Sequence, residues 1–155
     1  MKNKVDRILE VTLIGLMTIL VVDVLWQVFG RYVLSSPSSF TDELAGYLLI
    51  WVGVLGAAYV TGQKEHLAID LLIQKSKPLT QKRLLFTINL VIALFAIFVM
   101  VIGGSWLMLT RFQLNVNSAA LHLPLGYVYS VMPISGLLML YYSLVFMISD
   151  KQEEI

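Results

Sequence analysis

The sequence has 155 residues, of which 58% are hydrophobic and only 14% are charged, and its mean hydropathy is +0.81. A soluble domain cannot bury that much apolar surface, so the composition indicates an integral membrane protein. The net charge of +1 comes with basic residues in short flanks, which argues against a nucleic-acid partner, and the lack of cysteine excludes disulfides and thiolate metal sites.

Four apolar stretches follow one another along the chain, each close to the roughly 20 residues that a helix needs to cross a bilayer. They lie at about 11–33, 44–61, 84–109 and 128–148. The first follows basic residues, as in a secretory signal, but it is too long for one and no small-x-small pair follows it. We therefore expect an all-α fold, with residues 1–155 forming a single membrane domain of four transmembrane helices in the lipid bilayer.

The middle connection carries a short amphipathic pattern. His66, Asp70 and Gln74 recur at every fourth residue, and leucine and isoleucine fill most of the positions between them. A segment at about 66–75 is too short to span the bilayer, so we predict an interfacial helix whose polar stripe faces water or a partner. A simple extension of the second helix is the alternative.

Lysine and arginine are divided unevenly between the connections. Nine of them lie in the two termini and the middle connection: Lys2, Lys4, Arg7, Lys64, Lys75, Lys77, Lys82, Arg83 and Lys151. Only Arg31 and Arg111 lie in the other two connections. Cytoplasmic flanks collect basic residues, so both termini are predicted to be cytoplasmic and the segments around Ser36 and Asn115 periplasmic, in a bacterial inner membrane.

Asp23 is the outstanding polar residue, because a carboxylate inside a span is costly unless it is neutral, paired or facing water. Gln27 and Arg31 follow at intervals of one helical turn and make a polar stripe with it. The stripe is either a proton or ion relay or a hydrogen-bonding seam against a neighbouring helix. We favour the seam, because the spans contain no second carboxylate to act as a relay partner.

The start of the second helix carries two acidic residues next to the end of the first. Arg31 closes the first helix, and Asp42 with Glu43 opens the second across a short turn. This order makes an ion pair at the outer face easy to form. The alternative is that both ends are solvated and the pair contributes little. We expect a structural pair without a catalytic role.

Small residues mark one face of the second helix. Gly46, Gly53 and Ala57 recur along it, Gly56 lies beside them, and Trp51 lies in the same stretch. Close contact between transmembrane helices needs such a face, so these residues are predicted to pack against another helix or a partner.

The residue pattern of an enzyme is absent from the sequence. His66 and His122 lie on opposite predicted sides of the membrane, and His66 with Asp70 supplies only two metal ligands. No nucleophile has a matching base, and there is no phosphate-binding glycine loop. We expect no catalytic, metal or cofactor site in this chain.

An ordered set of motifs resembles a known family. It comprises Arg31-Tyr32, Thr41-Asp42-Glu43-Leu44, Trp51, Gly56-Ala57-Ala58 and His66-Leu67-Ala68-Ile69-Asp70. In this order they resemble the small membrane subunit of a TRAP transporter, the tripartite ATP-independent periplasmic type. Phe40 departs from the family pattern, in which tryptophan often precedes the acidic pair.

The resemblance implies two protein partners. A periplasmic solute-binding protein would deliver an acidic solute, and a large membrane subunit would move it with sodium, so sodium is expected in the partner and no cofactor in this chain. The small subunit would act as a fixed scaffold, and the overall pattern suggests a sialic acid system. Two alternatives stay open, a self-contained proton-coupled small multidrug exporter and a structural membrane protein unconnected to transport.

Overall fold

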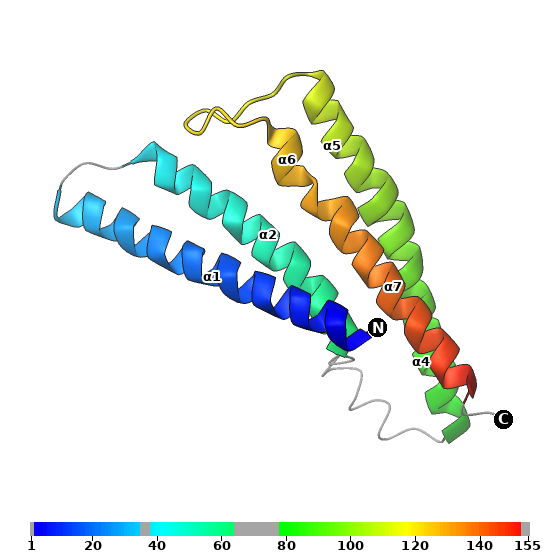
Figure 1. Ribbon diagram of the computed structural model, residues 1–155. Helices are drawn as coiled ribbons and strands as arrows, with labels where there is room; N and C mark the ends of the chain where they lie inside the picture. The colour runs from blue at the N-terminus through cyan, green and yellow to red at the C-terminus, as the bar shows by residue number, and fades with distance from the viewer. Residues whose placement is uncertain (1, 35–37, 64–77, 153–155) are drawn as a thin grey trace. The chain divides into compact units, whose positions relative to one another are not determined.

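The computed structural model describes residues 2–34, 38–63 and 78–152, and within them the regular elements are all helices (Figure 1). They are α1 (Lys2–Tyr32), α2 (Ser39–Gln63), α4 (Pro78–Phe95), η1 (Ala96–Gly103), α5 (Gly104–Gln113), α6 (Leu125–Tyr129) and α7 (Val131–Gln152). Four helical segments are long and apolar enough to span a membrane: Lys2–Tyr32, Ser39–Gln63, Arg83–Gln113 and Leu125–Ile148. The predicted all-α fold with four spans is confirmed.

The helices are longer than the apolar stretches that predicted them. α1 begins at Lys2, well before the apolar residues start, and α2 begins at Ser39. A helix satisfies its backbone hydrogen bonds in water as well as in lipid, so it can continue past the hydrocarbon through polar residues. The interfacial helix predicted at 66–75, with His66, Asp70 and Gln74, lies outside the described residues.

The chain divides into two compact units, which are described separately here. One comprises residues 1–56 and 106–131, and the other comprises residues 57–105 and 132–155. The first unit holds α1, most of α2, most of α5 and α6. The second holds the end of α2, then α4, η1 and α7.

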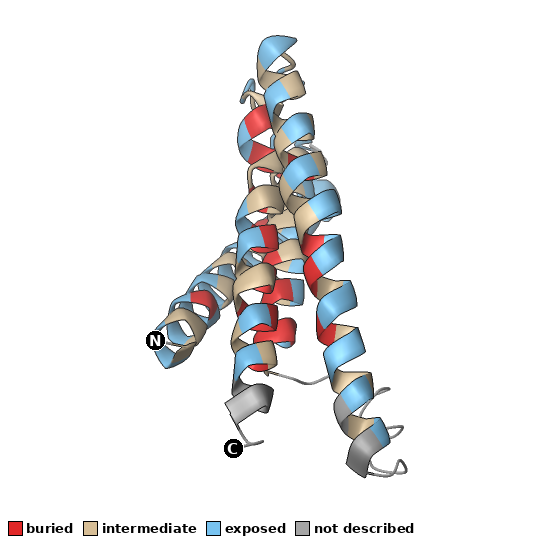
Figure 2. Ribbon diagram, turned by 90° about the vertical axis from the view of Figure 1, so that its right-hand side faces the viewer, coloured by how far each residue is buried: buried red, intermediate tan, exposed pale blue. Residues whose placement is uncertain are grey.

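In the first unit, α1 is mostly exposed, as its part near the N-terminus shows in Figure 2, and most of its buried and half-buried residues follow a narrow stripe. The stripe consists of buried or half-buried residues three or four positions apart: Leu9, Leu13, Leu16, Leu20, Asp23, Gln27 and Gly30. Such spacing places the residues on one side of a helix. The exposed sides are rich in valine, isoleucine and aromatic residues, which suits contact with lipid or with another protein.

In the second unit, small residues let three helical elements meet. Ala58 of α2, Ala96 of η1 and Met139 of α7 form the buried centre, surrounded by partly buried leucines, isoleucine and methionine. Tyr142 is fully buried, and a Cβ placed on Gly62 would lie 2.7 Å from its ring carbon Cζ. Glycine at position 62 is therefore what allows α2 to approach Tyr142 this closely.

A π-helix interrupts the third span. Residues Ala96–Gly103 form η1 between two α-helical parts of one continuous helix, and π-helices of this length are rare. α7 approaches η1 at Gly136, where an added Cβ would lie 2.6 Å from Cβ of Met100 and 3.1 Å from the backbone nitrogen of Val101. The wide helix and the glycine opposite it allow backbone-level contact within this unit.

Candidate functional site

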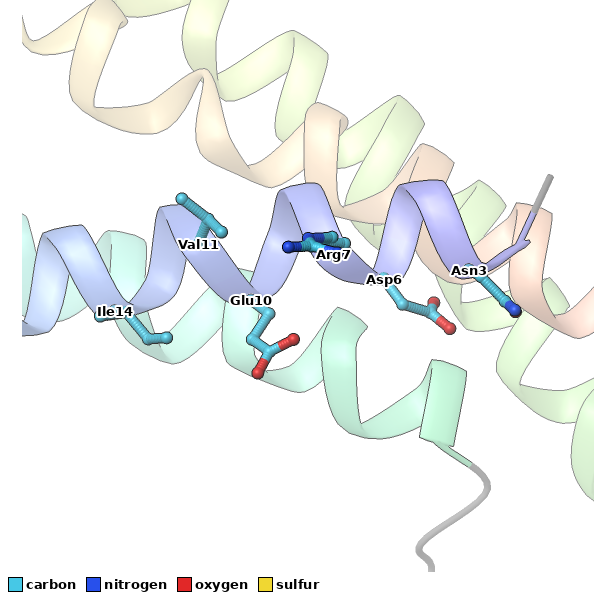
Figure 3. Close-up of a pocket in the computed structure, with 6 residues that line it drawn as sticks. All are labelled: Asn3, Asp6, Arg7, Glu10, Val11 and Ile14. Carbon is cyan, nitrogen blue, oxygen red and sulfur yellow. The ribbon is translucent and has the colours of Figure 1, made fainter.

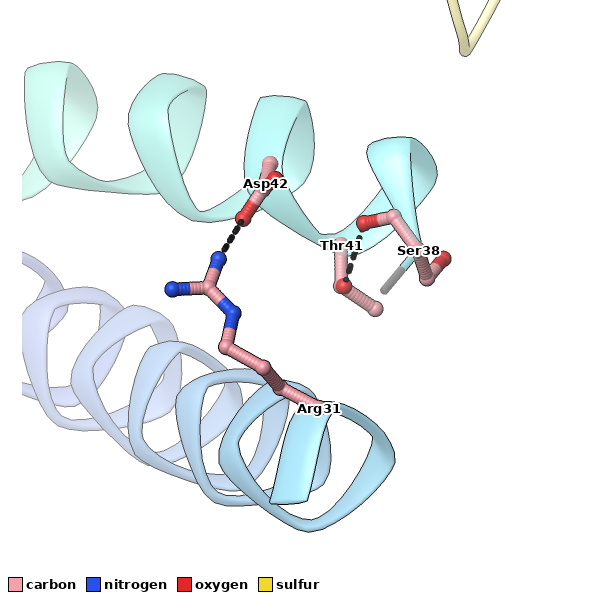
Figure 4. A network of polar contacts seen from close by, with 4 residues as sticks. All are labelled: Arg31, Ser38, Thr41 and Asp42. Atoms are coloured by element: carbon pink, nitrogen blue, oxygen red, sulfur yellow. Dashed lines mark hydrogen bonds and ion pairs between the residues drawn. The ribbon is translucent and has the colours of Figure 1, made fainter. Parts of the chain in front are cut away.

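A weak ion pair links the end of α1 to the start of α2 (Figure 4). Nη2 of Arg31 lies 3.7 Å from Oδ1 of Asp42, and both side chains are about half exposed. Thr41 donates its hydroxyl hydrogen to the carbonyl of Ser38 at 3.0 Å, which closes the first turn of α2. An exposed pair at this distance contributes about 0–1 kcal/mol, so it orients the two helix ends more than it stabilises them.

Glu43, which follows Asp42 in α2, binds a loop that is distant in the sequence. Its carboxylate accepts three consecutive backbone N–H groups, from Ala119 at 2.9 Å and from Ala120 and Leu121 at 3.0 Å each. The buried Ser118 hydroxyl also hydrogen-bonds to it. Successive N–H groups that converge in this way form a typical anion-binding nest, here occupied by a carboxylate of the same chain.

The loop that forms this nest is held by its own hydrogen bonds. The N–H of Ser118 donates to the carbonyl of Leu123 at 2.9 Å, and that of Leu125 donates to the carbonyl of Val116 at 2.9 Å. Asn115 and His122 have φ of 48° and 53°, left-handed values in which asparagine and histidine are among the commoner non-glycine residues. The loop therefore presents fixed donors to Glu43.

Two turns further along α2, Trp51 makes a second contact with the segment after this loop. Its indole Nε1 donates to the carbonyl oxygen of Val128 in α6 at 3.1 Å. α6 in turn rests on the end of α5, where the rings of Phe112 and Tyr127 meet edge to face at 5.1 Å. We call Glu43, Trp51, residues 118–121 and Val128 the Glu43 clasp; it ties α2 to α6 and to the loop before it.

Asp23 is buried in α1, at 7% exposure, and its Oδ2 has no hydrogen-bond partner among the described residues. Gln27, one turn later, is half-buried. The hydrogen-bonding seam that the sequence suggests for Asp23 and Gln27 therefore stays a prediction. Among the described residues, no group of three or more His, Cys, Asp or Glu side chains could hold a metal ion at Asp23 or elsewhere.

The small-residue face of α2 is open. A Cβ added at Gly46, Gly53 or Gly56 would meet no atom within 4 Å, and Ala57 is exposed as well. We call Gly46, Leu49, Gly53, Ala57 and Val60, all exposed, the open face of α2. Other glycines do pack inside the chain, among them Gly62, Gly104, Gly126 and Gly136. Nothing in the sequence marks Gly62 or Gly126 as a packing position apart from the small size of glycine.

Two hollows on the described surface lack the features of a reaction site. One, at the start of α1, is lined by a single helix and mixes both signs of charge: Asn3, Asp6, Arg7, Glu10, Val11 and Ile14 (Figure 3). Another, further along α1, is apolar and is lined by Val22, Leu25, Trp26 and Phe29. Neither encloses a ligand with converging polar groups, as small-molecule sites usually do.

Comparison with known proteins gives two matches. The model of the DctQ component of the tripartite ATP-independent periplasmic transporters matches residues 20–153. A Haemophilus influenzae protein, assigned by inference as a TRAP transporter small permease protein, is 34% identical over 138 residues. That alignment covers 88% of this chain and 81% of the relative.

Proposed function

This chain belongs to the DctQ component family of the tripartite ATP-independent periplasmic (TRAP) transporters, and we propose that it is the fixed scaffold beside which the large membrane subunit moves the solute. As a small permease subunit with four apolar helices, it is a multi-pass inner-membrane protein. Its family associates with a large membrane subunit and a binding protein. The resemblance read from the motifs at 31–70 is confirmed at the level of the family.

The observation that carries the scaffold proposal is the Glu43 clasp. A stationary subunit must keep its shape while its neighbour moves, so its helices need ties that resist displacement. Glu43 joins α2 to residues 76 to 78 positions away in the sequence, and Trp51 adds a contact over 77 positions. Ionised acceptors make the stronger hydrogen bonds, so these ties favour a stiff unit over a moving one.

The open face of α2 is the proposed contact with the large subunit. Its glycines leave room for another helix to approach at backbone distance, and this chain does not use that room among its described residues. The exposed apolar sides of α1 would then face lipid or the partner. In this proposal, the large subunit packs against the small residues that the sequence marked for packing: Gly46, Gly53, Gly56 and Ala57.

The finer assignments follow from the same proposal. Sodium binding and solute binding would belong to the large subunit, with no cofactor or catalytic group in this chain. The binding protein would dock at the end that carries the Glu43 clasp, because the basic bias of the flanks predicts that this end is periplasmic and that both termini are cytoplasmic. The solute would be acidic, and sialic acid is the proposed example.

The test is co-purification of the large subunit with matched glycine variants. Gly53→Leu fills the open face of α2, whereas Gly15→Leu puts the same side chain on α1, where an added Cβ also meets nothing within 4 Å. Both variants should fold, because at neither position does an added Cβ meet another part of the chain. We expect Gly53→Leu to lower the recovered complex several-fold and Gly15→Leu to leave it unchanged. The reverse result would show that the large subunit contacts α1 instead. If neither variant lowers the recovered complex, the open face of α2 does not contact the large subunit.

A further inference from the structure

Residues 118–121 direct four hydrogen-bond donors at a single group. The backbone N–H groups of Ala119, Ala120 and Leu121 donate to the Glu43 carboxylate at 2.9, 3.0 and 3.0 Å, and the Ser118 hydroxyl also bonds to it. Successive amides that converge on one point form a concavity that binds negative charge. The loop therefore contains an anion-binding site, and its occupant in this structure is a side chain of the same protein.

The loop is held in this shape by bonds that do not involve Glu43. The N–H of Ser118 donates to the carbonyl of Leu123, and the N–H of Leu125 donates to the carbonyl of Val116, both at 2.9 Å. The N–H of Leu123 donates in return to the Ser118 hydroxyl oxygen at 3.3 Å. These bonds stay in place when the Glu43 side chain is absent, so the amides remain aimed at one point. Such preorganisation lowers the entropy that a ligand loses on binding.

The donors are within reach of a solute in water. Residues 118–121 lie between the spans Arg83–Gln113 and Leu125–Ile148, outside both of them. Ala119 is exposed, and Ala120 and Leu121 are half-buried. A soluble anion can therefore approach these amides directly from the aqueous phase, without crossing hydrocarbon.

We propose that residues 118–121 form a preorganised binding site for a small carboxylate, which Glu43 fills as a tethered, autoinhibitory ligand and which a free carboxylate fills when Glu43 is removed. The hydrogen bonds are shared between two oxygens, Oε1 for Ala119 and Oε2 for Ala120 and Leu121, so the site matches a two-oxygen anion better than a single-centre one such as chloride. Tethering gives Glu43 a high effective concentration, and dilute carboxylates cannot displace it. The site is independent of the large subunit and of the proposed scaffold role.

The test is hydrogen exchange at the amides of residues 119–121 in the purified chain, with and without sodium acetate. In Glu43→Ala the site is empty, and exchange there should slow by about ten-fold as acetate approaches saturation, because bound anion protects the amides. Sodium chloride at equal ionic strength should not slow it. Glu43→Gln is the matched control, since an uncharged side chain of the same size still fills the site and acetate should have no effect. Wild type should not respond to acetate at tens of millimolar either.

Three results would overturn the site. If acetate does not slow exchange in Glu43→Ala, the donors do not stay aligned without Glu43. If chloride protects the amides as well as acetate does, the effect is one of salt and the site does not select a carboxylate. If wild type responds as Glu43→Ala does, Glu43 is not the ligand that excludes acetate. Should Glu43→Ala fail to fold without acetate, recovery of the fold in acetate supports the site, and failure in acetate as well contradicts it.

Discussion

Trp51→Phe removes one tie of the Glu43 clasp while keeping an aromatic side chain in place. The indole N–H that donates to the Val128 carbonyl at 3.1 Å is lost, and Val128 is buried, at 6% exposure. A hydrogen bond of this kind contributes about 0.5–1.5 kcal/mol, and leaving a buried acceptor without its donor adds to the loss. We expect the free energy of unfolding to fall by about 1–2 kcal/mol, a five- to thirty-fold change in the equilibrium.

The assay is unfolding of the purified chain in mixed micelles, followed by circular dichroism as the fraction of denaturing detergent rises. Trp106→Phe is the matched control, because Trp106 is 75% exposed and its indole makes no hydrogen bond among the described residues. It should change the free energy of unfolding by less than about 0.5 kcal/mol. Equal losses in the two variants would show that the Trp51 hydrogen bond does not stabilise the fold, and the reasoning would fail.

Four further outcomes are expected. Glu43→Ala should abolish hydrogen-exchange protection at the amides of Ala119, Ala120 and Leu121, which bind its carboxylate, whereas Asp42→Ala should leave that protection intact. Asp23→Asn should retain most solute uptake in the assembled transporter. Asp23→Leu should keep or raise stability, because the buried Oδ2 has no hydrogen-bond partner that the substitution would leave unsatisfied. Loss of uptake in a normally assembled Asp23→Asn complex would instead point to ion coupling. Gly136→Leu should lower the free energy of unfolding by about 1–3 kcal/mol or more, since its Cβ would lie 2.6 Å from Cβ of Met100. A thermal-shift measurement would record the loss. Ala119→Cys should react with an impermeant thiol reagent outside intact cells and Lys4→Cys should not; the opposite pattern would reverse the proposed orientation.

Much of the fold follows from the sequence because lipid imposes a simple rule. A segment of about 20 apolar residues must form a helix in hydrocarbon, and the four stretches at 11–33, 44–61, 84–109 and 128–148 fall within described helices except for Val33, after the end of α1, and Ser130, between α6 and α7. The helix ends were not predictable in the same way, since α1 continues to Lys2 through polar residues that carry no apolar signal.

The site was only partly predictable. The order of Arg31, Asp42 and Glu43 indicates that charges meet at the start of α2, but not that Glu43 faces a loop 76 to 78 residues away. That contact depends on the backbone path of residues 118–121, which have no distinctive side chains. The π-helix has no sequence pattern of its own, and which glycines pack depends on the neighbouring helix: Gly53 is open while Gly62 touches Tyr142.

The most direct test of the scaffold proposal is solute uptake after the Glu43 clasp has been locked covalently. The chain has no cysteine, so Glu43→Cys with Ala120→Cys can be joined by a short bifunctional thiosulfonate and released again with a reducing agent. In proteoliposomes that hold the complete transporter with its binding protein, locked and released forms should take up solute at the same sodium-driven rate. A locked form that is inactive and recovers on reduction would show that this end of the small subunit moves during transport.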